Sequence, residues 1–152
     1  MPQTGVAMTA TAKEQGVRIF LAEDNPADVY LIERALKEHD IAFQLEVAEN
    51  GKQALSFLRR ADGLEKEGLP SLIVLDLNLP QHDGAEILQR IRQTPSLESV
   101  PVVVLTSSDS PRDQLTALES GASRYIRKPS NLQDFMAIGA ALKDLLTGTN
   151  RG

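Results

Sequence analysis

The sequence contains no cysteine and no tryptophan, and only two tyrosines and four phenylalanines, among its 152 residues. Without cysteine, the chain forms no disulfide and offers no thiolate nucleophile or metal ligand. No apolar run approaches the roughly 20 residues that a transmembrane helix needs. The N-terminus also lacks the charged segment and apolar stretch of a secretory signal. These absences lead us to expect a cytoplasmic protein.

Positive charge is also sparse, since 16 lysines and arginines stand against 21 aspartates and glutamates, for a net charge of −5. A protein that binds duplex nucleic acid usually concentrates its cations on one face. The small basic groups at Arg59–Arg60 and at Arg124, Arg127 and Lys128 are too sparse for such a face. We therefore predict that the chain binds no nucleic acid.

Five short apolar runs, rich in β-branched residues, alternate with amphipathic segments. The clearest runs are almost continuously apolar, which is typical of parallel strands covered on both faces. A chain of this length accommodates one domain with a substantial core. The predicted strands occupy about residues 17–23, 43–48, 71–76, 101–106 and 123–127.

Helix-start signals follow these runs. Asn25–Pro26 offers an N-cap and a proline at the first helical position, as does Ser110–Pro111. Ser130 and Gln133 have the spacing of a capping box. The five predicted helices end near His39, Ala61, Gln93, Gly121 and Leu146.

Five alternations of strand and helix predict an α/β fold with an open, doubly wound (βα)5 sheet that has helices on both faces. Residues 1–16 are rich in Thr, Ala, Gly and Gln without periodicity, and we expect a disordered leader there. One domain is then expected over residues 17–147. Residues 148–152 would form a short tail with no output domain.

Polar residues end four of the predicted strands. Glu23–Asp24 closes the first, Asp76 the third, Thr106 the fourth and Lys128 the fifth. Because the carboxyl ends of parallel strands meet at one edge of a sheet, we expect these side chains to lie together.

This combination suits the transfer of a phosphoryl group to a carboxylate. Nucleophile and phosphoryl group are both anionic, and a divalent cation that holds oxygens of each lowers their repulsion. Asp24 and Asp76 supply the oxygen ligands that Mg²⁺ prefers, and Glu23 can ligate through water. Lys128 and Thr106 can contact phosphoryl oxygens. The pattern therefore favours a signalling switch over a metabolic enzyme.

The segment from Val17 to Leu146 resembles the receiver domain of two-component response regulators. The resemblance implies a flavodoxin-like sheet with strand order 2-1-3-4-5. The matching motifs are Glu23–Asp24–Asn25, Leu75–Pro80 followed by Asp83–Gly84, Val104–Ser107 and Tyr125–Pro129.

The resemblance implies that Asp76 accepts a phosphoryl group from a sensor histidine kinase. Mg²⁺ would be held by Asp24, Asp76 and the main-chain carbonyl of Asn78, with Glu23 acting through water. It also implies a cis peptide bond between Lys128 and Pro129, which an X–Pro bond permits at modest cost. Such a domain is a signalling phosphoacceptor that takes part in its own phosphorylation and dephosphorylation, and we do not expect an enzyme.

The resemblance further implies a switch in which phosphorylation draws the Thr106 hydroxyl inward and Tyr125 turns from exposed to buried. The surface of the fourth helix and fifth strand would then change and serve docking or homodimerisation. The loop over residues 62–70 and the Asp76–Pro80 motif are similar to those of small regulators that partner phytochrome-type sensor kinases.

Two residues near the predicted site need separate comment. Ser107 stands where many receivers have a small apolar residue, and His82 is expected to be exposed to solvent.

A phosphorelay intermediate or phosphate sink, passing phosphate to a histidine phosphotransfer domain, is the alternative function. An aspartyl-phosphate hydrolase usually has a second acid where this chain has Asn78. No glycine-rich turn follows the first strand, which disfavours a nucleotide-binding Rossmann domain.

Overall fold

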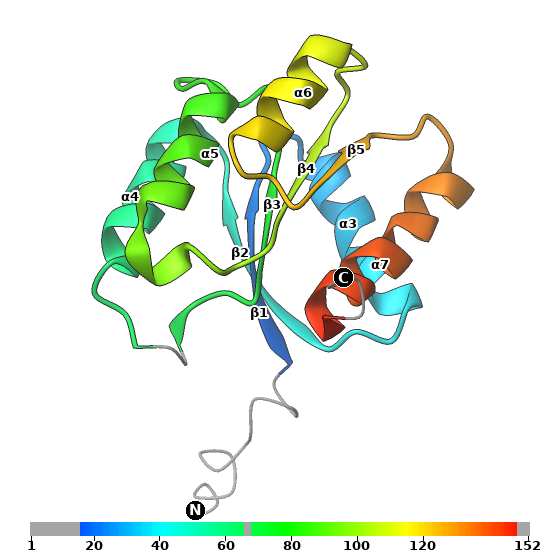
Figure 1. Cartoon of the computed structure of the whole chain (residues 1–152). Coiled ribbons are helices and arrows are strands. Elements are labelled where there is room, and N and C mark those ends of the chain that lie inside the picture. The colour runs from blue at the N-terminus through cyan, green and yellow to red at the C-terminus, as the bar shows by residue number, and fades with distance from the viewer. Residues whose placement is uncertain (1–15, 66–67, 149–152) are drawn as a thin grey trace, which may run out of the picture.

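The computed structural model describes residues 16–65 and 68–148. A five-stranded parallel sheet in the order β2-β1-β3-β4-β5 forms its centre (Figure 1). This order and the parallel pairing confirm the predicted fold class. The strands are β1 (Val17–Ala22), β2 (Phe43–Ala48), β3 (Leu72–Leu75), β4 (Val102–Thr106) and β5 (Arg124–Arg127).

Helices cover both faces of the sheet (Figure 1). The predicted helix boundaries are confirmed to within about two residues, and among the described residues no helix has the length and apolar character needed to span a membrane. The helices are α3 (Pro26–Glu38), α4 (Gly51–Ala61), α5 (Gly84–Gln93), α6 (Pro111–Glu119) and α7 (Leu132–Thr147), with a short 3-10 helix, η2, at Pro95–Leu97.

The core has two layers because successive side chains of a strand point to opposite faces of the sheet. In β3, Ile73 and Leu75 pack with α4 and α5, whereas Leu72 and Val74 pack with α3 and α7. All four side chains of this strand are therefore buried, which explains why its sequence is continuously apolar. The strands β2 and β5 lie at the sheet edges and are only partly buried.

Asparagine side chains cap three of the helices, α3, α4 and α7. Asn25 Oδ1 accepts a hydrogen bond from the backbone N–H of Ala27 at 2.9 Å, as expected for the start of α3. The cap of α7 is Asn131, whose Oδ1 accepts from the backbone N–H of Asp134 at 2.8 Å. The predicted capping box at Ser130 was therefore wrong by one residue, because Asn131 has the extended backbone of a cap and an equally suitable acceptor.

Of the predicted leader and tail, the structure describes only Gly16 and Gly148, the latter as the C-cap of α7. Gly16 is buried and has a φ of +89°, and a Cβ at this position would collide with the backbone of Ala42. The backbone N–H of Val17 donates to the carbonyl of Ala42 at 2.9 Å. Gly16 is therefore the packed entry to β1, and its structure differs from that expected for a disordered residue.

Candidate functional site

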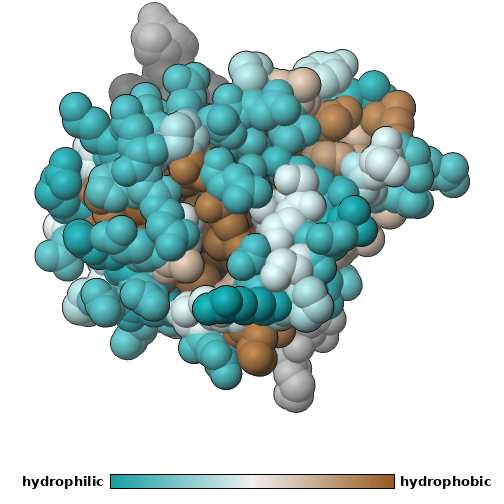
Figure 2. All heavy atoms as spheres, turned by 90° about the horizontal axis from the view of Figure 1, so that it is seen from above, coloured by the Kyte–Doolittle hydropathy of each residue, from teal (hydrophilic) through white to brown (hydrophobic). Residues whose placement is uncertain are grey.

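The structure brings the predicted site residues together at the carboxyl edge of the sheet. Glu23 follows β1, Asp76 follows β3, Thr106 ends β4 and Lys128 follows β5. Glu23, Asp76 and Thr106 are 1%, 5% and 0% exposed, although each carries a polar group. Figure 2 views the molecule from above and shows a largely hydrophilic face with hydrophobic atoms visible in a central hollow.

Lys128 lies at the centre of a cluster of carboxylates. Its Nζ is 2.8 Å from Glu23 Oε1, 2.7 Å from Asp28 Oδ2 and 2.9 Å from Asp76 Oδ2. An ammonium group has three N–H donors, so these three partners use all of them. The backbone N–H of Lys128 also donates to the carbonyl of Thr106 at 2.7 Å, which fixes the lysine beside the end of β4.

Asp28 is the residue of this cluster that the sequence analysis missed. It lies in the first turn of α3, two residues after the helix begins at Pro26 beside the acidic pair. This position in the sequence could have identified Asp28 as a site residue, because the first turn of a helix that follows a strand end remains near the edge of the sheet. Its partner Lys128 is 100 residues away in the sequence, so no local pattern connects the two.

Three carboxylates of the site have the arrangement of a metal-binding group. Glu23, Asp24 and Asp76 each offer an oxygen, and these oxygens lie within 4.8 Å of one another. Asp24 is exposed, whereas the other two are buried, so a cation has access from solvent. Carboxylate oxygens are the ligands that Mg²⁺ prefers, and the donor set therefore fits this ion.

Backbone N–H groups orient two of these carboxylates. The N–H of Asn78 donates to Asp76 Oδ1 at 3.0 Å, and the N–H of Asn25 donates to Glu23 Oε2 at 3.1 Å. The other oxygen of each carboxylate contacts Lys128. The ligand role of the Asn78 carbonyl stays a prediction.

The charges of the cluster shift the pKa values of Glu23 and Lys128. Burial, reinforced by the charge of Asp76, raises the pKa of Glu23 to about 7, although a hydrogen bond from Lys128 opposes this shift. Burial lowers the pKa of Lys128, but hydrogen bonds to Asp28, Glu23 and Asp76 outweigh it and raise the pKa overall. Lys128 is therefore a cation at neutral pH, whereas the raised pKa of Glu23 means that this carboxyl titrates near neutral pH.

The variant Glu23→Gln should change how the stability of the metal-free protein depends on pH. The pKa of Glu23 rises from 4.5 to about 7 on folding, so its contribution to stability is full at low pH and is lost as the pH rises through about 7. Relative to the variant, the wild type should lose up to about 3 kcal/mol between pH 5 and pH 8. Urea unfolding in the presence of a chelator measures this difference, and parallel pH profiles for the two proteins would contradict it.

The predicted switch residues, Thr106 and Tyr125, both form hydrogen bonds. Asn78 Nδ2 donates to Thr106 Oγ1 at 3.3 Å, which holds the threonine hydroxyl beside the site. Tyr125 is half-buried, and its hydroxyl donates to the carbonyl of Ser108 at 2.9 Å. Tyr125 is thus connected to the loop that follows Thr106. Ser107, in the same loop, is exposed.

Two expectations near the site were wrong. All peptide bonds in the described part of the chain are trans, including Lys128–Pro129. Lys128 reaches its carboxylate partners with this bond in the intrinsically preferred isomer. His82 is partly buried and not fully exposed, because Gly51 packs against its side chain, and its Nδ1 is 3.8 Å from Glu86 Oε1.

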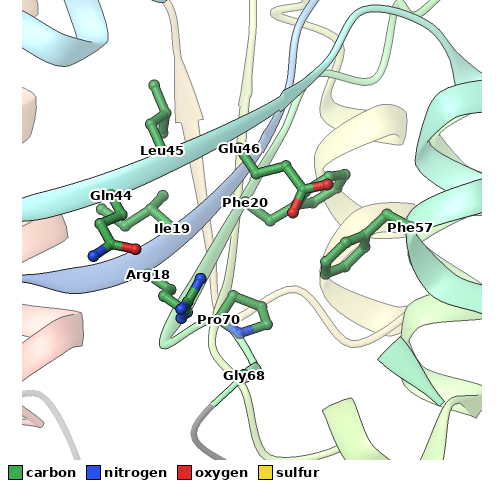
Figure 3. A pocket seen from close by; sticks show the side chains of 9 residues that line it. All are labelled: Arg18, Ile19, Phe20, Gln44, Leu45, Glu46, Phe57, Gly68 and Pro70. Carbon is green, nitrogen blue, oxygen red and sulfur yellow. The ribbon is translucent and has the colours of Figure 1, made fainter. Parts of the chain in front are cut away.

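A pocket of about 140 Å³ lies at the opposite end of the strands, beside residues near the start of β1 and β2 (Figure 3). The rings of Phe20 and Phe57 stack in its wall with centroids 3.8 Å apart. Arg60 lies over Phe57 and pairs with Glu46 at 2.7 Å. These contacts attach α4 to the sheet, and the pocket has no connection to the carboxylate cluster.

Comparison with known proteins identifies the family. The model of the response regulator receiver domain matches residues 19–139. Response regulator Rcp1 of a Synechocystis species is 40% identical over 116 residues, which cover 76% of this chain and 79% of that protein. A probable methanogenesis regulatory protein, FilR2 of Methanothrix harundinacea, is 37% identical over 88% of this chain and 85% of that protein.

Solved structures show the same likeness. The phosphorylated cyanobacterial phytochrome response regulator RcpA superposes with a TM-score of 0.77 at 34% identity, covering 88% of this chain and 96% of that one. The Mn²⁺-bound form of response regulator Rcp1 gives a TM-score of 0.74 at 37% identity, covering 84% of this chain and 92% of that one. One of these neighbours therefore carries a phosphoryl group and the other a divalent metal.

Proposed function

Because this chain belongs to the response regulator receiver domain family, we propose that Asp76 accepts a phosphoryl group from a sensor histidine kinase and that the chain is a phosphorylation-controlled switch. The observation that carries the proposal is the environment of Asp76. Its carboxylate is buried at the end of β3, between the ammonium of Lys128 and the N–H of Asn78. An anion in this place is stabilised and oriented for attack on phosphorus.

The transfer step forms a bond between an Asp76 oxygen and phosphorus. The bond from phosphorus to the imidazole nitrogen of the kinase histidine breaks, and that nitrogen leaves with the electron pair. Mg²⁺ held by Glu23, Asp24 and Asp76 would supply charge neutralisation between the two anions. Lys128, whose Nζ is 2.9 Å from Asp76 Oδ2, would contact a phosphoryl oxygen as the new bond forms.

The conformational response would begin at Thr106. Its hydroxyl would leave Asn78 and donate to a phosphoryl oxygen, since a charged acceptor makes a stronger hydrogen bond than a neutral one. Movement of the loop after β4 would then break the hydrogen bond between Tyr125 and the Ser108 carbonyl, and Tyr125 would turn inward. The surfaces of α6 and β5 would change together.

The altered surface would dock a partner or a second copy of the chain. Leu115 and Leu118 of α6 are 58% and 44% exposed and are three residues apart, so they lie on one side of the helix. Neighbouring apolar side chains on a surface are typical of an interaction site. The similarity to the phytochrome response regulator RcpA supports a phytochrome-type sensor kinase as the source of phosphate.

Light scattering in the presence of Mg²⁺, with and without beryllofluoride as a mimic of the phosphoryl group, tests the proposed switch. The molar mass of the wild type should double when the mimic is added. Leu115→Glu should remain monomeric because it places a charge on the exposed side of α6. Leu64→Glu, at an exposed leucine before β3, should behave as the wild type.

A wild-type protein that stays monomeric with the mimic would contradict homodimerisation. Rapid transfer of its phosphate to a histidine phosphotransfer domain would then favour the phosphorelay intermediate or phosphate sink. A dimer both with and without the mimic would contradict control of assembly by phosphorylation.

A further inference from the structure

Asp28 stands apart from the other two carboxylates that contact Lys128. The oxygens of Glu23 and Asp76 belong to the group that can hold a metal ion, together with Asp24, whereas Asp28 is not a member of that group. Its Oδ2 nevertheless lies 2.7 Å from Lys128 Nζ, the shortest of the three contacts. Asp28 thus binds the lysine without being a candidate ligand of the cation.

The lysine and the cation would share two of their carboxylates. Lys128 donates to Glu23 Oε1 and Asp76 Oδ2, and both carboxylates belong to the candidate metal group. A cation that binds these carboxylates repels the ammonium and draws its acceptors away. Asp28 is then the acceptor that Lys128 can keep, because it lies on α3 and outside the metal group.

The position of Asp28 suits a carboxylate that keeps its contact with Lys128 when a cation binds. It lies in the first turn of α3, where the helix dipole stabilises a negative charge without a counter-ion. Its side chain is 18% exposed and that of Lys128 is 12% exposed, so solvent screens their attraction only in part. The carboxylate is therefore a fixed anchor for the ammonium.

We propose that Asp28 is a positioning residue that holds the Lys128 ammonium at the side of the carboxylate cluster. The anchor keeps the lysine from displacing the cation and keeps it within reach of a phosphoryl group on Asp76. The inference rests on the proposed function, in which Glu23, Asp24 and Asp76 bind Mg²⁺ and Asp76 accepts the phosphoryl group.

A double-mutant cycle separates this role from the loss of a negative charge near the metal. The affinity for Mg²⁺ is measured by calorimetry in the wild type, Asp28→Asn, Lys128→Ala and the double variant. Asp28→Asn should weaken binding about fivefold to tenfold when Lys128 is present, because the ammonium, without its Asp28 partner, competes more strongly with the cation for Glu23 and Asp76. In the Lys128→Ala background the same change should weaken binding by no more than about twofold, which is the effect of the charge alone.

Asp134→Asn is the matched control. Asp134 occupies the same position in the first turn of α7 as Asp28 does in α3, but its carboxylate accepts from Asn131 Nδ2 at 2.9 Å. This variant loses a first-turn charge without releasing Lys128, and it should bind Mg²⁺ as the wild type does.

A second readout follows Lys128 directly. In ¹⁵N-labelled wild type containing Mg²⁺ and beryllofluoride, the side-chain ammonium of Lys128 should exchange slowly with water and give an observable signal. Asp28→Asn should lose this signal through fast exchange, whereas Asp134→Asn should keep it.

Two results would overturn the anchor role. One is an equal loss of Mg²⁺ affinity from Asp28→Asn in both backgrounds, and the other is a persistent ammonium signal in Asp28→Asn. A wild type that binds no Mg²⁺ would instead overturn the proposed function, and the inference with it, so the two failures are distinguishable.

Discussion

Replacing Asp76 with asparagine is expected to reduce phosphoryl uptake from a stoichiometric level to the background of the assay. The amide oxygen of asparagine is a far weaker nucleophile than a carboxylate, and no other described carboxylate is both buried among donors and placed after β3. The side-chain shape is retained, and the amide oxygen can still accept from the N–H of Asn78. The fold should therefore survive while the chemistry is lost.

Labelled phosphate from a histidine kinase or a small phosphodonor, with mass spectrometry of the intact chain, provides the measurement. Asp83→Asn is the matched control, because Asp83 caps α5 by accepting from the N–H of Ala85 at 3.0 Å and asparagine caps helices equally well. This variant should be labelled as the wild type is. Retention of label by Asp76→Asn at the wild-type yield would contradict the assignment of the phosphoacceptor.

The second large effect is expected from Lys128→Ala. The substitution leaves Glu23, Asp28 and Asp76 without the cation that each contacts within 2.9 Å. Loss of one partner from a largely buried ionic cluster leaves its other members uncompensated, and at pH 8 the free energy of unfolding should fall by about 3 kcal/mol. Saturating Mg²⁺ should restore most of this loss, because the ion replaces the missing positive charge. The variant should also fail to dimerise with beryllofluoride.

Urea unfolding at pH 8, with a chelator or with Mg²⁺, measures both parts of this prediction. Lys37→Ala removes an exposed lysine from the last turn of α3 and should change the free energy of unfolding by less than about 0.5 kcal/mol. A Lys128→Ala protein as stable as the wild type in chelator would show that the cluster does not depend on the ammonium. If Mg²⁺ does not restore the lost free energy of unfolding, the effect comes from the packing of the lysine side chain and not from its charge.

Most of the fold can be predicted from the sequence, because the patterns of burial and capping that define its elements are local. The side chains of β3 and β4 are buried on both faces, so their runs are continuously apolar. The cap at Asn25 and the proline at Pro26 define the start of α3 with groups that lie within a few residues of one another. The positions of Asp76 and Lys128 at the edge of the sheet follow from the same patterns, since each comes directly after its strand.

Other features depended on contacts between distant segments. Asp28 carries no signal that links it to Lys128, because the pair is 100 residues apart and Asp28 lies on a helix. The partial burial of His82 results from Gly51, a residue of another helix. Asn131 and Ser130 are both suitable caps by type, and the backbone conformation decided between them.

The sequence by itself determined the number and order of the elements, the parallel sheet and the residues that end its strands, because hydrogen bonding and the burial of apolar side chains act over short segments. The tertiary structure alone decided how the charges pair. Strand order places β4 between β3 and β5, so Lys128 reaches past the end of β4 to Asp76 and Glu23, while α3 brings Asp28 to the same ammonium. The strength of such charge contacts depends on distance and burial, and both are set only when the chain has folded.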